Sequence, residues 1–175
     1  MNPASYARST EVHRTLSTIF GPWSKQSGFK RLGSGRCAYM KAASHTKDAV
    51  LAFEVQCNSF GAADHGGMFA LNAGAGAIDP RHLSGQHARI LKFCSQELVE
   101  SAARLEAEIL RKHPRTAKPG WCWERGRDNW CQYFDAESVQ QWGTLLLPFL
   151  PELLEHSVIQ AGLSPSEFAL LQPAT

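Results

Sequence analysis

Polar side chains alternate with apolar ones along residues 50–60, and their chemistry could serve a ligand or a partner. The polar residues are Glu54, Gln56 and Asn58. Alternation with a period of two is typical of a β-strand with one buried face, so these three would form a row on the other face. Asn72, from the next expected strand, could extend the row, although its neighbours there depend on the strand register. The row is either a recognition face with fixed donors and acceptors or the wet face of an antiparallel sheet.

Aromatic residues are dense in residues 121–134, which read as a β-hairpin. Two aromatic-rich runs flank a polar tetrapeptide that contains Gly126, and this arrangement suits a four-residue loop. Core packing is one interpretation, because aromatic side chains dominate core energetics. The other is an exposed anchor patch, since Trp and Arg are enriched at interface hot spots. The candidate contact residues are Trp121, Trp123 and Trp130, with Arg125 and Arg127 at the hairpin tip as rim contacts.

Patterns that would carry catalysis or metal binding do not stand out. Cys122 and Cys131 are nine positions apart, and neither C-x-x-C nor H-E-x-x-H occurs, so the sequence predicts no zinc site. His82 and His87 read as loop histidines. No G-x-S-x-G elbow occurs, and strand parity makes Cys57 a buried, inert thiol. With only one acid in the polar row, a paired-carboxylate mechanism is not suggested either. The sequence leans away from an enzyme and predicts no cofactor.

Composition places the chain among ordinary folded domains. Its 175 residues are 43% hydrophobic and 19% charged, and a chain of this length buries most of its unfolded surface. The net charge of +2, with basic residues scattered along the chain, does not favour nucleic acid. No run of 18 apolar residues and no apolar core near the start occur, so we expect neither a membrane span nor a signal peptide. Five dispersed cysteines favour reduced thiols and a cytoplasmic location.

Runs of strands separated from runs of helices indicate an α+β class. Asp135 is the expected N-cap of a helix, and residues 164–167 fit a capping box that would open a last short helix before the tail to residue 175. We therefore expect a single domain over residues 1–175, in which an N-terminal helix, a long central helix and C-terminal helices pack on an antiparallel sheet of about five strands. The expected elements are helix 5–23, limited by Gly21-Pro22; strands 36–42, 50–60 and 67–73; helix 84–113; the hairpin 121–134; a helix after Asp135; and a helix from about residue 151.

Several short motifs together resemble a bacterial domain-of-unknown-function family, the one numbered forty-three hundred and four. They are GFKR at 28–31, VQCNSFG at 55–61, FALNAG at 69–74, WCQY at 130–133 and LPFL at 147–150. The resemblance covers about residues 5–155. It implies a small cytoplasmic α+β bacterial protein with relatives among accessory genes, some near toxin genes, and by analogy a binding or immunity role.

Two hypotheses from different classes follow. The first is a non-enzymatic cytoplasmic module that binds another protein, but neither nucleic acid nor membrane; its most concrete form is an immunity-type protein that neutralises a bacterial toxin. The second is a small-ligand-binding protein or enzyme that uses the polar row. Glu54 would then be the acid or base, and Gln56, Asn58 and Asn72 would orient the ligand.

Overall fold

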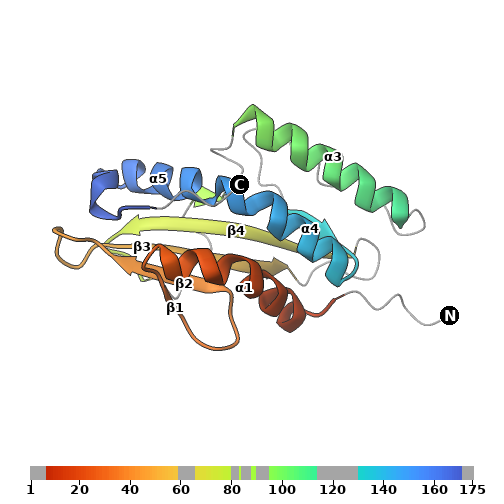
Figure 1. Ribbon diagram of the computed structural model, residues 1–175, viewed down its shortest axis with the longest axis horizontal. Helices are drawn as coiled ribbons and strands as arrows, with labels where there is room; N and C mark the ends of the chain where they lie inside the picture. The colour runs from red at the N-terminus through yellow and green to blue at the C-terminus, as the bar shows by residue number, and fades with distance from the viewer. Residues whose placement is uncertain are drawn as a thin grey trace.

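The computed structural model describes residues 7–58, 66–79, 83, 88–89, 95–113 and 130–170. It confirms an α+β fold with an antiparallel sheet (Figure 1). The elements are α1 (Ser9–Gln26), β1 (Lys30–Arg31), β2 (Ala38–Ala42), β3 (Val50–Asn58), β4 (Gly67–Gly76), β5 (Ala88–Arg89), α3 (Gln96–Lys112), β6 (Cys131–Tyr133), α4 (Ala136–Leu146), α5 (Leu150–Gln160) and the short 3₁₀ helices η2 (Leu147–Phe149) and η3 (Pro165–Glu167).

The sheet is built around the long antiparallel pair of β3 and β4. Its strand order is β1-β2-β3-β4-β5, and β6 also pairs with β4. The register sets Phe53 opposite Ala73 and Glu54 opposite Asn72. Because side chains alternate across a strand, Phe53 and Glu54 lie on opposite faces. We call the side of Phe53 the helix face and the side of Glu54 the polar face.

The helix face carries the hydrophobic core, and Phe53 is at its centre. Phe20 and Trp23 from α1, Phe29, and Tyr39 from β2 surround its ring at centroid distances of 5.1 to 6.4 Å. Buried residues of α3, α4 and α5 join the same cluster. In Figure 1, α1 and α4 lie side by side along the sheet, and α3 lies beyond α4. All the described α-helices therefore contribute to one apolar layer.

Helix α1 continues past the proline that was expected to limit it. It ends at Gln26 with Pro22 inside, so the predicted boundary at Gly21-Pro22 was wrong. The Pro22 ring is exposed and costs the helix one hydrogen bond, while the next residue, Trp23, is 5% exposed in the core. Burial of such a large side chain outweighs the local cost of the proline.

The predicted helix 84–113 was wrong at its beginning. Helix α3 starts at Gln96, where the side chain of Ser95 accepts a hydrogen bond from the Leu98 N–H. Ala88–Arg89 instead forms strand β5 against β4. The short polar N-cap residue, not the apolar spacing, marks where this helix begins.

Two helix caps were predicted after β6, and the structure confirms the first and contradicts the second. Asp135 caps α4 through a hydrogen bond from the Ser138 N–H at 2.8 Å, in a reciprocal capping box. At residues 164–167, Ser164 makes no such capping bond, and only the 3₁₀ helix η3 forms. The Glu167 carboxylate turns away to the loop between β2 and β3, where it accepts from the N–H and hydroxyl of Thr46 at 2.9 and 2.6 Å. The capping box predicted at residues 164–167 was therefore wrong.

Candidate functional site

The polar row of β3 lies on the polar face, and Glu54 is buried there while Gln56 and Asn58 are half-buried. Glu54 is 1% exposed and Asn72, its partner across the strand pair, is 2% exposed. The Nδ2 of Asn72 donates a hydrogen bond to Oε1 of Gln56 at 3.0 Å. Asn58 is half-buried and lies further along β3, opposite Met68. The structure thus brings together Glu54, Gln56 and Asn72, and the interpretation of a wet sheet face is wrong for Glu54 and Asn72.

Arg36 neutralises the buried carboxylate of Glu54. Its Nη2 forms an ion pair with Oε2 of Glu54, and the arginine side chain remains 49% exposed while the glutamate side chain is 2% exposed. An ionised carboxylate is too costly to bury without such a partner. The sequence analysis did not single out Arg36, although strand alternation could have indicated it. Ala38 lies opposite Glu54 in the sheet, and Arg36, two residues before Ala38, lies on the same face as Glu54.

Gln132 extends the buried polar layer onto β6. It is 1% exposed and lies opposite Met68 in the register. With Glu54 paired to Arg36 and Asn72 paired to Gln56, the main hydrogen-bonding groups of the layer are engaged inside the protein. A one-residue slip of β3 would separate these pairs and move them to the apolar side, so the layer fixes the strand register.

A histidine and two cysteines meet between α1 and the sheet, a contact that the sequence did not predict. Nε2 of His13 lies 3.9 Å from Sγ of Cys57, and the backbone N–H of Cys37 donates to Nδ1 of His13 at 3.2 Å. Since Nδ1 accepts this bond, the neutral imidazole carries its proton on Nε2 and presents it to the sulfur. His13 is therefore in the wrong tautomer to remove the thiol proton of Cys57.

The electrostatics of this contact also oppose a reactive thiolate. Burial, followed by the charges of Arg36 and Arg31, lowers the pKa of His13. Burial raises the pKa of Cys57 to about 12. Both groups are neutral near pH 7, whereas an activated cysteine needs a lowered pKa. The pair provides packing and a weak hydrogen bond and is not a nucleophilic dyad.

An open groove of about 740 Å³ runs between α1 and strands β1 and β2. Lys25 and Arg31 supply cations, and Ser17, Thr18 and Tyr39 supply hydroxyl groups. The Arg31 guanidinium is held by Ser17 Oγ at 3.1 Å and by backbone carbonyls of the turn that follows β1. None of the described residues that line this groove is acidic. It can therefore receive an anionic group.

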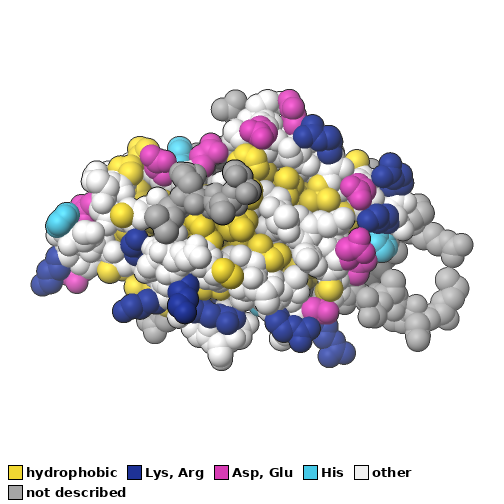
Figure 2. Space-filling model, in the orientation of Figure 1, with side chains coloured by type: hydrophobic (Ala, Val, Ile, Leu, Met, Phe, Trp, Pro, Cys, Tyr) yellow, Lys and Arg dark blue, Asp and Glu magenta, His cyan; other side chains and the backbone are white. Residues whose placement is uncertain are grey.

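The groove belongs to a wider separation of charge. Residues 7–50 contain eight lysines and arginines and two acidic residues, whereas residues 95–113 and 130–170 contain three basic and nine acidic residues. Figure 2 shows a row of Lys and Arg side chains along the rim formed by α1 and the first strands, and a mixture of acidic and basic side chains on the side of α3. We call the first set the basic rim; its members are Arg8, Arg14, Lys25, Lys30, Arg31, Arg36, Lys41 and Lys47.

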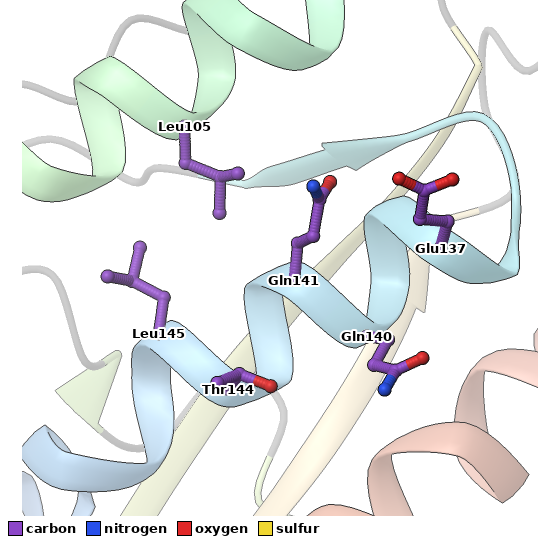
Figure 3. A pocket seen from close by; sticks show the side chains of 6 residues that line it. All are labelled: Leu105, Glu137, Gln140, Gln141, Thr144 and Leu145. Atoms are coloured by element: carbon purple, nitrogen blue, oxygen red, sulfur yellow. The ribbon is translucent and has the colours of Figure 1, made fainter.

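A second groove, of about 550 Å³, separates α3 from α4 (Figure 3). Leu105 of α3 and Leu145 of α4 face each other across it, Gln141 points into the space between the helices, and Glu137 stands at one end. Its described lining residues include neither a cation nor a nucleophilic cysteine or histidine. These residues offer apolar contacts and amide groups, and they do not suggest a catalytic reaction.

Of the five hairpin candidates, Trp130 lies within the described residues. Trp121, Trp123, Arg125 and Arg127 lie outside the described residues. Trp130 is half-buried and directly precedes β6. Among the described residues, no three His, Cys, Asp or Glu side chains gather as a metal site. Within the same ranges, no helix has the length and apolar character needed to cross a bilayer.

Comparisons with known proteins give no relative: no family model, no curated protein and no solved structure matches the chain. The resemblance to a domain-of-unknown-function family therefore stays a prediction, and any function rests on the geometry above.

Proposed function

We propose that the chain is a non-enzymatic binding protein that recognises an acidic surface of another protein through its basic rim. The observation that carries the proposal is the separation of charge, with eight basic and two acidic residues in residues 7–50 but three basic and nine acidic residues in residues 95–113 and 130–170. A surface of one sign steers a partner of the opposite sign and suppresses wrong partners. A scattered distribution with the same net charge would provide neither effect.

The state of the individual cations supports a protein partner over a nucleic acid. Arg36 is paired with Glu54, and Lys41 donates to the Ser27 carbonyl at 2.6 Å. Arg31 is held in one orientation by three acceptors. Binding to repeated phosphates depends on many available cations, whereas fixed and partly neutralised ones suit a partner with one matching shape.

The candidate chemistry supports binding over catalysis. The His13–Cys57 contact has the wrong tautomer and shifted pKa values for a nucleophile, and the Glu54 carboxylate is engaged with Arg36. Neutralisation of a toxin, the role that the family resemblance implies, is the narrower form of this proposal. It requires that co-expression of the chain rescues cells from the toxic partner.

Two matched double variants test the proposal. Lys25→Glu/Lys30→Glu reverses exposed charges of the basic rim, and Glu152→Lys/Glu155→Lys reverses exposed charges on α5. Tagged wild type and both variants are used to capture partners from nuclease-treated native lysate at physiological salt, with quantitative mass spectrometry.

We expect a stoichiometric protein that is captured by the wild type and by the α5 variant and is depleted at least about tenfold with the rim variant. Equal capture by all three proteins would contradict the basic rim as the binding surface. Loss of the wild-type complex on nuclease treatment would assign the rim to nucleic acid instead.

A further inference from the structure

The guanidinium of Arg31 is fixed so that one of its edges remains available. Its Nε donates to the Arg36 carbonyl at 3.2 Å, and its Nη2 donates to the Ser34 carbonyl at 3.2 Å and to Ser17 Oγ at 3.1 Å. These bonds use the Nε–H and both N–H groups of Nη2. The two N–H groups of Nη1 have no acceptor among the described residues. The other bonds already fix the orientation of the guanidinium.

Lys25 provides a second cation beside the same groove. It lies in the last turn of α1, is exposed, and makes no ion pair with any described residue. Nearby, Thr18 Oγ1 donates to the Thr15 carbonyl at 2.7 Å, so its hydroxyl hydrogen is engaged. The groove thus offers positive donors and lacks a carboxylate of its own to satisfy them.

The absence of a side chain at Gly21 keeps the floor of the groove open. A Cβ at this position would stand 3.3 Å from the hydroxyl oxygen of Tyr39. Phe29 and Pro22 provide apolar walls beside the two cations. The groove volume of about 740 Å³ falls in the range of small-ligand pockets, so it accommodates a few residues of a peptide and not a single ion alone.

We infer that this groove seats an acidic peptide segment of the partner, with a side-chain carboxylate on the Nη1 edge of Arg31 and Lys25 Nζ and with apolar atoms against Phe29. The inference rests on the proposed function, because it names the chemistry that the basic rim accepts at one place. A pre-oriented guanidinium loses little freedom when it binds a carboxylate, which favours this position over the freely moving lysines of the rim.

The inference is tested by titration of the full ¹⁵N-labelled chain, followed by NMR. The probes are a capped peptide of alternating Glu and Leu, the same peptide with Gln in place of Glu, and inorganic phosphate. The variants are Arg31→Lys, which keeps the charge but loses the fixed edge, and Lys25→Met, which removes a side chain with no described ion pair. Arg111→Met, which removes an exposed cation on α3 outside the basic rim, is the matched control.

We expect the Glu peptide to shift amide signals of residues 17–25 and 29–39. Its affinity should fall at least about fivefold with Lys25→Met and with Arg31→Lys and stay unchanged with Arg111→Met. Equal binding of the Gln peptide, or equal loss with Arg111→Met, would overturn the inference. Tighter binding of phosphate with the same dependence on the variants would overturn the carboxylate and assign a phosphate ligand.

The outcomes separate this inference from the proposed function. If the peptide does not depend on the groove while partner capture still depends on Lys25 and Lys30, the groove fails and the basic rim stands. If the peptide binds as expected but no partner is captured, the groove stands as an acidic-peptide site and the wider proposal fails.

Discussion

Glu106 is a carboxyl group buried on the apolar side of α3. It is 9% exposed and makes no hydrogen bond or ion pair with the described residues. Burial, followed by the charge of Glu106, raises the pKa of the Cys131 thiol on β6. Burial raises the pKa of Glu106 itself from 4.5 to about 7. The protonated form is therefore the one that the packed helix tolerates, and α3 is held less firmly when the carboxyl ionises.

Replacement of Glu106 by Gln should stabilise the chain at high pH. The folded state keeps a proton that the unfolded state loses above pH 4.5, so wild-type stability falls as the pH rises from about 4.5 to about 7 and then stays low. Near pH 8 the variant should gain on the order of 3 kcal/mol, and near pH 4 almost nothing. Urea unfolding at both pH values measures this. Glu97→Gln, an exposed change on the same helix, is the control and should show no such difference.

Removal of Arg36 should leave the buried charge of Glu54 uncompensated. We expect Arg36→Ala to lower the free energy of unfolding by about 2 to 4 kcal/mol. This is somewhat less than the loss of one partner from a fully buried ion pair, because the Arg36 side chain is half-exposed. Adding Glu54→Gln to this variant should restore part of the loss. Chemical denaturation of the four proteins of the double-mutant cycle gives the coupling, and purely additive effects would refute the pairing.

At the scale of elements, α1 and α4 approach each other closely at Gly143. A Cβ at this position would lie 2.6 Å from Cδ1 of Ile19 and 2.8 Å from Cδ2 of Leu16. Alanine improves the intrinsic helix propensity by about 1 kcal/mol, but the buried Leu16 has little room to move.

We expect Gly143→Ala to be destabilising by about 1 to 2 kcal/mol in spite of its better propensity. Thermal unfolding followed by circular dichroism checks the sign. Gly35→Ala, where a Cβ would meet no atom within 4 Å, is the matched control and should be close to neutral. A stabilised Gly143→Ala variant would mean that the two helices can separate at low cost.

The sequence predicted elements where a local pattern and the tertiary structure agree. The alternation along β3 gave its face assignment, and Asp135 gave the start of α4. It failed where a tertiary contact decided the result. Pro22 stays inside α1 because Trp23 is buried, and Glu167 turns to Thr46 instead of completing a capping box. Apolar spacing alone also did not place the start of α3, which the cap at Ser95 marks.

The residues of the candidate site were harder to predict from the sequence than the fold. The row of Glu54, Gln56 and Asn72 was found, but Arg36, which pairs with Glu54, lies before β2 and meets the row only in the folded chain. In the same way His13 of α1 meets Cys57 on the other face of β3. The basic rim did leave a signal. Eight of the ten charged residues in the first 50 positions are basic, a pattern that the small net charge of the whole chain conceals.

At the scale of the whole molecule, the separated charges predict a specific dependence on salt. The rate of association with an acidic partner or peptide should fall by about tenfold or more between roughly 0.02 M and 0.3 M salt, because screening shortens the range of the rim's field. The dissociation rate should change little. Stopped-flow mixing over a salt series measures both rates, and a salt-independent association rate would rule out electrostatic steering.

The contact between α1 and α4 also has a consequence for protein synthesis. Ile19 and Gly143 are about 120 residues apart in the chain, so a ribosome needs roughly 6 to 25 s to make the second after the first. During this interval the apolar stripe of α1 has no helix partner from the C-terminal third. The nascent chain therefore depends on early pairing of β2, β3 and β4 to cover Phe20 and Trp23, and on chaperones where that cover is incomplete.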